Sequence, residues 1–363
     1  SGGSQSGSNA SGDTLTIWEY ETDNSAMGQA WAKAVEIFKQ RHPEVTVKQE
    51  DQTFEQIQKN AKIVLTGDDV PDVMEYNKGN GTAGQLASQG LLTDLSDVVK
   101  DKGWDKTVTG PTAVTAQYDE NGLMGSGSWY GIPNYGEYVT VYYNKKMFDD
   151  IGAKVPTTLA ELEGVMDAFV AAGQTPLAEA GAEYPLGQLW YLLALSNGDD
   201  QFIKDYQMFA GSVDWTGGPT AKGAAKLKEW GDKGYIATDS SGLTAEDMGT
   251  AFIAGKYPIM VSGSWWFGLK DQMTDEWGQF LFPSKYTAGS SGNLWVVPKN
   301  AKNKELAYEF IDITLSDEVQ KVLGEAGGLP IAGDPSGISD EQTRVFTENF
   351  QQLVKDSGLA FYP

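Results

Sequence analysis

Aromatic and polar side chains stand next to each other at several points of the sequence. A sugar ring has C–H-rich faces and a rim of hydroxyls; flat aromatic rings cover such faces, while carboxyl and amide groups bond the hydroxyls in pairs. These mixed segments therefore predict carbohydrate binding, although any single ring of this kind is more often packed in a core. The segments are Tyr20-Glu21 after Trp18-Glu19, Tyr76-Asn77, Asn134-Tyr135-Gly136-Glu137, Trp215 between Asp214 and Thr216, and Ser264-Trp265-Trp266.

The doublet Trp265-Trp266 follows a Gly-Ser pair. Two neighbouring indoles do not easily point into the same core, so we expect one of them to present an exposed face. This favours stacking of at least one ring on a ligand, and truncation to alanine is then expected to weaken binding by ~1–3 kcal/mol.

Composition excludes several other kinds of site. The net charge is −23, and only Arg41 and Arg344 are arginines, the residue best suited to gripping phosphate. Nucleic acids, anionic membranes and phosphorylated ligands are therefore poor partners. There is no cysteine, and His42 is the single histidine, so thiolate sites, zinc clusters and histidine triads are not expected. We expect no cofactor and no metal.

The sequence around these residues predicts alternating strands and helices, as in an α/β protein. The residues at 15–18, 45–47 and 72–76 are strand-like, and helical spacing of apolar residues fills 27–40 and 54–65 between them. Such alternation predicts parallel strands with crossover helices. Because ligands of open α/β sheets bind beyond the carboxyl ends of strands, Glu21 and Asn77 are expected at such a site.

Similar signals continue to residue 315. We expect strands at 138–144, 257–261 and 294–298, and helices at 189–195, 221–230, 245–254 and 304–315. Thr158 followed by Glu161 predicts a helix start. Residues 1–13, rich in Ser and Gly, indicate a flexible tether, either behind a lost lipid anchor or as a cloning remnant.

Several ordered segments between Thr14 and Ile331 resemble the extracellular solute-binding proteins of family 1, the maltose-binding-protein-like receptors of ABC importers. The segments are Leu15-Thr16-Ile17-Trp18, Pro71-Asp72-Val73, Gly90-Leu91-Leu92-Thr93-Asp94-Leu95, Tyr130-Gly131-Ile132-Pro133, Tyr142-Tyr143-Asn144-Lys145, Pro156-Thr157-Thr158, Gly263-Ser264-Trp265 and Lys304-Glu305-Leu306-Ala307. Each is weak alone, but their order is specific.

The resemblance implies a two-lobed α/β fold of the periplasmic-binding-protein type, with hinge-linked lobes and a cleft between them. It predicts lobe 1 from 14–133 plus 267–315 and lobe 2 from 134–266 plus 316–363. Hinge crossings are expected near 133–138, 263–267 and 315–317. Family members usually continue beyond Pro363, where a further region supplies cleft aromatics, so a truncated C-terminus is one expectation.

The resemblance also extends the set of ligand-binding residues. In the family, the segments that match the strand-end segments named above contact the sugar. Two further matching segments add Gln188 with Trp190, and Gly328 with Leu329. Charged groups of maltose receptors are replaced here by Tyr and Asn, so maltose is not the expected ligand.

The implied function is the non-enzymatic, substrate-binding component of an ABC transporter. It would capture a neutral oligosaccharide, stabilise a closed form and deliver the sugar to the permease subunits. We expect a monomer outside the cell or in the periplasm, with membrane contact only through an N-terminal lipid anchor. Two alternatives stay open: a glycoside hydrolase pairing Glu21 with Glu137, and a receptor for peptides, polyamines or metals. The sugar, its linkage and its length do not follow from the sequence.

Overall fold

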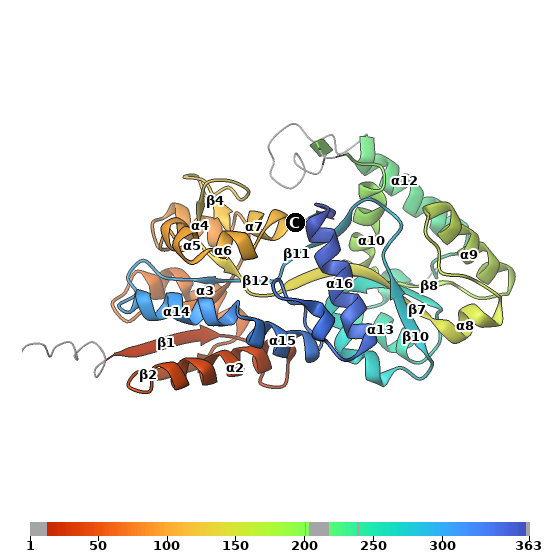
Figure 1. Ribbon diagram of the computed structural model, residues 1–363. Coiled ribbons are helices and arrows are strands. Elements are labelled where there is room, and N and C mark those ends of the chain that lie inside the picture. Colours follow the sequence, from red (N-terminus) through yellow and green to blue (C-terminus); the bar gives the residue numbers. More distant parts are fainter. Residues whose placement is uncertain (1–12, 200, 203–217, 238–239, 361–363) are drawn as a thin grey trace, which may run out of the picture. The chain divides into compact units, whose positions relative to one another are not determined.

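The computed structural model describes residues 13–199, 201–202, 218–237 and 240–360 (Figure 1). The chain divides into two compact units, which are described separately. Unit 1 consists of residues 1–136 and 291–354, and unit 2 of residues 137–290 and 355–363. The predicted tether therefore lies outside the described residues, apart from Asp13.

The core of unit 1 is a five-stranded sheet in the order β2-β1-β3-β12-β6. Its strands β1 (Thr14–Glu19), β2 (Thr46–Asp51) and β3 (Val73–Asn77) are parallel, whereas β12 (Asn293–Val296) is antiparallel to both β3 and β6 (Ile132–Pro133). Helices α2 (Ala26–Arg41) and α3 (Phe54–Leu65) connect the parallel strands. The predicted β-α-β-α-β pattern is confirmed.

Local signals explain where these helices begin. The Ser25 hydroxyl accepts a hydrogen bond from the Gly28 N–H at the start of α2, and Thr53 and Gln56 form a reciprocal capping box at the start of α3. The apolar face of α2, including Trp31 and Phe38, is buried in one core with Leu15 and Ile17 of β1.

Helices from the later sequence complete unit 1. Helices α14 (Lys304–Thr314) and α15 (Asp317–Glu325) both pack on α2, and α16 (Glu341–Lys355) follows. The remaining elements are α4 (Ala83–Ser88), α5 (Ser96–Lys102), α6 (Trp104–Thr107), α7 (Gly110–Val114), the short β4 (Gln117–Tyr118) and β5 (Ser128–Trp129) pair, and the 3-10 turn η3 (Pro335–Gly337).

Unit 2 is built on a six-stranded sheet, β13-β11-β7-β9-β8 with β10 added on β7. Its long strand β7 (Gly136–Asn144) is antiparallel to β9 (Ile259–Gly263), and β9 is parallel to β8 (Leu177–Ala178). The other strands are β10 (Trp277–Phe280), β11 (Thr287–Ser291) and β13 (Leu359–Ala360).

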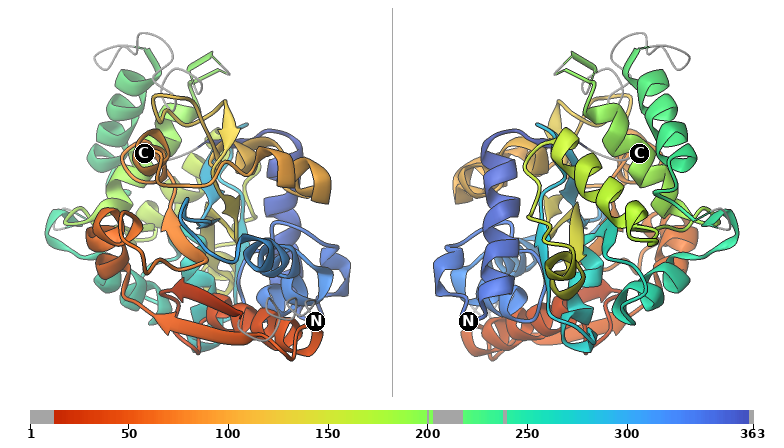
Figure 2. Two further views of the ribbon diagram at one scale, coloured as in Figure 1. Left: turned by 90° about the vertical axis from the view of Figure 1, so that its left-hand side faces the viewer. Right: turned by 90° about the vertical axis from the view of Figure 1, so that its right-hand side faces the viewer.

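Helices α8 (Lys145–Asp150), α9 (Leu159–Ala171), α10 (Tyr184–Leu195), α12 (Gly218–Asp232) and α13 (Ala245–Ile253) accompany this sheet, with 3-10 segments η1 (Ser240–Gly242) and η2 (Ser264–Gln272). Helices α10 and α12 lie side by side in Figures 1 and 2 and pack on each other. The predicted strands and helices of this region are confirmed within a few residues.

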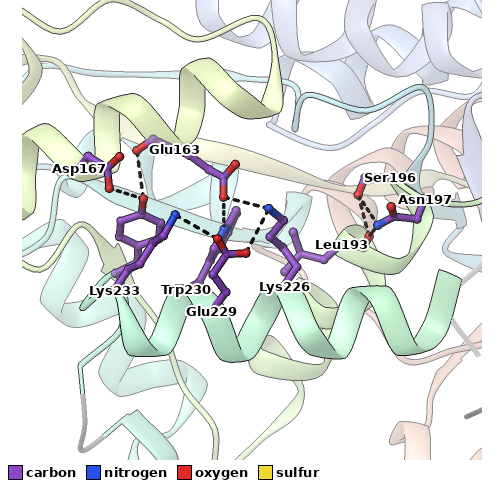
Figure 3. Close-up of polar contacts among 10 residues, drawn as sticks. Glu163, Asp167, Leu193, Ser196, Asn197, Lys226, Glu229, Trp230 and Lys233 are labelled. Atoms are coloured by element: carbon purple, nitrogen blue, oxygen red, sulfur yellow. Dashed lines mark hydrogen bonds and ion pairs between the residues drawn. The ribbon is translucent and has the colours of Figure 1, made fainter. Parts of the chain in front are cut away.

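A polar network joins α9 to α12 and to the turn after it (Figure 3). Oε2 of Glu163 accepts hydrogen bonds from Trp230 Nε1 at 2.8 Å and from Lys226 Nζ at 3.3 Å. The Tyr235 hydroxyl donates to a carboxylate oxygen of Asp167. Because these groups come from separate elements, the network fixes their relative register.

The unit boundaries differ from the predicted lobes in three places. Residues 134–136, which include Asn134 and Tyr135, belong to unit 1 and not to unit 2. Residues 267–290 belong to unit 2, because β10 and β11 join the sheet of β7. Residues 316–354 belong to unit 1, because Val319 and Leu323 of α15 are buried in the core of β1 and α2. The chain passes between units at 136/137, 290/291 and 354/355, so only the first predicted crossing coincides with a boundary.

Candidate functional site

The carboxyl ends of β1 and β3 bring together the first predicted site residues in unit 1. Trp18 of β1 is level with Met74 of β3, so the residues that follow each of them emerge at the same edge of the sheet. Tyr20 and Glu21 directly follow β1, and Asn77 is the last residue of β3. This is the edge at which parallel α/β sheets bind ligands.

A buried carboxyl group that was not among the predicted residues organises this edge. Glu75 is fully buried; its Oε1 accepts the Tyr20 N–H at 3.3 Å and its Oε2 accepts Asn134 Nδ2 at 2.8 Å. Asn134 is also fully buried, and its Oδ1 accepts the Asn293 N–H at 3.3 Å. Glu75 thus connects the loop after β1 to the residue after β6. We call Tyr20, Glu75 and Asn134 the strand-end cluster.

Burial determines the charge state of the carboxyl groups at this edge. It raises the pKa of Glu19 to about 8, with a further contribution from the neighbouring Asp51. Burial also raises the pKa of Glu75 well above its usual range, and the nearby carboxylates of Glu21 and Glu19 add to the effect. A protonated carboxyl both donates and accepts hydrogen bonds, as a sugar hydroxyl does.

The tyrosines at this edge have different surroundings. Tyr20 is half-buried and meets Phe54 edge-on, with ring centroids 5.1 Å apart. The half-buried Tyr135 lies over Gly292, where an added Cβ would come within 1.9 Å of the ring, and its hydroxyl accepts Asn293 Nδ2 at 2.8 Å. Tyr76 is only 5% exposed, so its ring packs inside the unit.

In unit 2, the Trp doublet lies at the start of η2, directly after β9. The buried Ser264 hydroxyl accepts the Tyr138 N–H at 3.2 Å, which ties η2 to β7. The half-buried Trp266 ring lies against Gly249 of α13, where an added Cβ would be 2.1 Å from a ring carbon. Trp266 is therefore a packing residue between η2 and α13 in this unit. The Trp265 side chain lies outside the described part of the structure.

The two predicted residues of α10 differ from each other. Trp190 Nε1 donates to the Thr220 carbonyl at 3.3 Å and so fastens α10 to α12. Gln188 is 6% exposed, and its buried Oε1 has no hydrogen-bond partner among the described residues. A buried acceptor without a hydrogen-bond donor is unusual in proteins. A ligand hydroxyl could supply the missing donor.

Glu179, which directly follows β8, is a second unpredicted carboxyl group. It is 3% exposed; Oε1 accepts the Ala180 N–H at 3.1 Å, whereas the buried Oε2 has no partner within the described residues. Burial raises its pKa to about 8. The only sequence signal for it was its place at a strand end, since the strand itself is two residues long.

The remaining predicted residues have mainly structural surroundings or are undescribed. Leu329 is buried, and its carbonyl accepts the Gly136 N–H at 2.8 Å; a Cβ at Gly328 would be 2.5 Å from Leu323. Glu137 is half-buried in β7 of unit 2, a different unit from that of Glu21. Trp215 lies outside the described residues.

The described residues lack two features that other functions would need. They contain no group of three or more His, Cys, Asp or Glu side chains arranged to hold a metal ion. In the same part of the chain, no helix combines the length and apolar character of a membrane span.

Comparison with known families distinguishes a solute-binding protein from a glycoside hydrolase. The model of the bacterial extracellular solute-binding proteins matches residues 19–321. The chain belongs to this family. Solute-binding proteins of this family bind their substrates without catalysing a reaction, which confirms the predicted family and the prediction that the chain is not an enzyme.

Relatives of this solute-binding protein are named for sugars. It is 29% identical to a probable sugar-binding periplasmic protein of Rhizobium meliloti over 49% of this chain and 41% of that one. It is 27% identical to the diacetylchitobiose-binding protein DasA of Streptomyces coelicolor over 88% of this chain and 73% of DasA. The chain thus spans about two fifths of the length of the rhizobial relative.

Solved structures share the fold. A probable secreted solute-binding lipoprotein from Streptomyces coelicolor superposes with a TM-score of 0.78 at 17% identity, covering 92% of this chain and 86% of that one. A chitin oligosaccharide-binding protein gives 0.73 at 21% identity, covering 96% and 88%. The predicted two-lobed α/β fold class is confirmed, while the hinge, the cleft and the ligand-binding residues stay predictions.

Proposed function

We propose that this solute-binding protein is the substrate-binding component of an ABC importer and captures a neutral oligosaccharide. The observation that carries the proposal is the strand-end cluster, in which the buried Glu75 bonds both the loop of Tyr20 and the side chain of Asn134. These carboxyl and amide groups lie near the half-buried Tyr20 ring, at the carboxyl ends of parallel strands, and ligands of such sheets commonly bind there, which supports the proposal.

The charge pattern supports a neutral ligand. A cation receptor needs ionised carboxylates, yet burial favours the protonated form of both Glu19 and Glu75. The protein has a net charge of −23 and contains only two arginines, and both features disfavour an anionic ligand. Relatives described as binding maltooligosaccharides and diacetylchitobiose point in the same direction.

In unit 2 we propose Gln188 and Glu179 as further hydroxyl-binding groups. Both are more than nine-tenths buried, and each has a buried oxygen with no partner among the described residues. Burial without a partner is costly, and a ligand hydroxyl that donates to either oxygen would remove the cost.

The cellular setting is part of the same proposal. We propose a monomer outside the cell or in the periplasm, anchored by an N-terminal lipid and read by permease subunits. Relatives include a periplasmic protein and a Streptococcus pneumoniae lipoprotein of an ABC transporter, which support an extracytoplasmic location.

A thermal-shift screen tests the proposal. Malto-, chito-, xylo- and galacto-oligosaccharides are compared with spermidine and a peptide mixture, and the sugars are recovered and checked for cleavage. We expect a stabilising shift with one neutral series and no cleavage, because a ligand that binds only the native state raises the unfolding midpoint. A shift with spermidine alone, or new reducing ends, would reject the proposal.

A further inference from the structure

Phe54, the first residue of α3, is an exposed aromatic side chain next to the strand-end cluster. Its side chain is 44% exposed. The other large hydrophobic residues that the described structure exposes are aliphatic: Ile63, Leu123, Val155, Val170 and Val345. A phenyl ring left open to water at this edge of the sheet is therefore a distinctive feature of unit 1.

The backbone around Phe54 is firmly held. The Gln52 N–H donates to the Glu19 carbonyl at 3.0 Å, which ties the loop before α3 to the end of β1. In the capping box, the Gln56 N–H donates to Thr53 Oγ1 at 3.1 Å and the Thr53 N–H to Gln56 Oε1 at 3.0 Å. The ring of Phe54 is thus presented from a preorganised helix start, which lowers the entropy cost of using it in binding.

A continuous series of contacts joins Phe54 to the buried pair Glu75 and Asn134. The rings of Phe54 and Tyr20 are 5.1 Å apart at an interplanar angle of 86°, an edge-to-face pair. The backbone N–H of the same Tyr20 donates to Glu75, which in turn accepts from Asn134. In such a perpendicular pair one ring meets the other with its edge, and the Phe54 side chain remains open to solvent.

We propose that Phe54 forms a second subsite, which stacks on a further uncharged pyranose ring of an oligosaccharide whose neighbouring ring is bound at the half-buried Tyr20. The buried Glu75 and Asn134 hold the loop of Tyr20 in place. This inference rests on the proposed function, and it adds that the ligand is an oligosaccharide of at least two sugar rings. Asp51 and Glu55, three residues before and one residue after Phe54 in the sequence, are exposed and acidic, which favours neutral sugars over uronic acids and sulfated sugars.

Calorimetric titration of matched variants tests the subsite. Phe54→Ala is compared with Ile63→Ala, which removes a 74% exposed hydrophobic side chain from the same helix. Mono-, di- and trisaccharides of the series that binds the native protein are titrated into each. We expect Phe54→Ala to weaken binding of the longer sugars about tenfold and of the monosaccharide little, as for a peripheral aromatic anchor. Phe54→Trp should keep the native affinity and Ile63→Ala should match it.

The outcomes separate this inference from the proposed function. Equal affinity of the native protein and Phe54→Ala for every sugar overturns the subsite and leaves sugar binding intact. An equal loss for sugars of all lengths also overturns it, because Phe54 would then act on the first ring. If the native protein binds no sugar of any length, the proposed function itself is overturned. Circular dichroism confirms that the variants are folded.

Discussion

The side-chain amide of Asn134 donates a 2.8 Å hydrogen bond to Oε2 of Glu75, and neither residue is exposed to solvent. The bond links the end of a short antiparallel strand to the middle of a parallel one. A carboxyl group buried at this depth needs such partners, because burial of an unpaired polar group is costly. The strand-end cluster therefore depends on this pair.

Removing the amide should destabilise unit 1. Asn134→Ala leaves the buried Glu75 Oε2 without its donor, so we expect the free energy of unfolding to fall by ~1–3 kcal/mol. Urea denaturation followed by circular dichroism measures the change. The exposed Asn121→Ala serves as the control, and an equal effect of both substitutions would show that the bond contributes nothing specific.

Stability should depend on pH through Glu179. Its folded-state pKa of about 8 lies above the ordinary value of 4.5, so the folded state keeps its proton where the unfolded state has lost it. The stability that Glu179 contributes is fully present below pH 4.5. It declines as the pH rises above 4.5 and is lost once the pH passes the folded-state pKa of about 8. For Glu179 alone it amounts to about 5 kcal/mol.

Glu179→Gln removes the titrating group and should flatten the fall of the melting temperature between pH 5 and 8. The exposed Glu246→Gln is the matched control in unit 2 and should leave the profile unchanged. Identical profiles for the native protein and Glu179→Gln would contradict the assigned pKa.

The two tryptophans of the doublet should behave differently. Trp266 packs against Gly249, so Trp266→Ala should lower the stability of unit 2 by about 3 kcal/mol, as large-to-small core changes do. Gly249→Ala should also destabilise the unit, because its Cβ would overlap the ring. Trp265→Ala tests ligand stacking: we expect sugar affinity to fall by ~1–3 kcal/mol. If only Trp266→Ala weakened sugar binding, and did so without lowering stability, Trp266 and not Trp265 would be the stacking residue.

The network in Figure 3 should contribute to stability and leave sugar binding unchanged. Glu163→Ala leaves Trp230 Nε1 without its acceptor, and we expect a loss of ~1–3 kcal/mol in the free energy of unfolding. The control is Asp232→Ala, which breaks the exposed ion pair with Lys228 and should have no measurable effect, since exposed pairs contribute little. Equal melting temperatures of the two variants would contradict a structural role for Glu163.

Periodicity made much of the fold predictable. Trp31, Val35 and Phe38 recur at helical spacing, and all three are buried on one face of α2. The assignment of 316–354 failed, because α15 follows α14 closely along the chain and no local pattern states that both pack on α2. Such long-range packing depends on the complementary shape of distant side chains.

The candidate site was only partly predictable. Tyr20, Glu21 and Asn77 were expected at strand ends because parallel strands end at a common edge. Glu75 was missed, since an acidic residue inside an apolar strand gives no sign of the partner that keeps it buried. The packing of Trp266 on Gly249 was not predicted, because Gly249 lies on another element.

Calorimetric titration of neutral oligosaccharides into the native protein and into Tyr20→Ala determines whether this edge of the sheet binds sugar. We expect saturable binding of one sugar per native chain and about tenfold weaker binding after loss of the Tyr20 ring. Saturable heat from spermidine with none from any sugar, or equal sugar affinity in both proteins, would contradict this expectation.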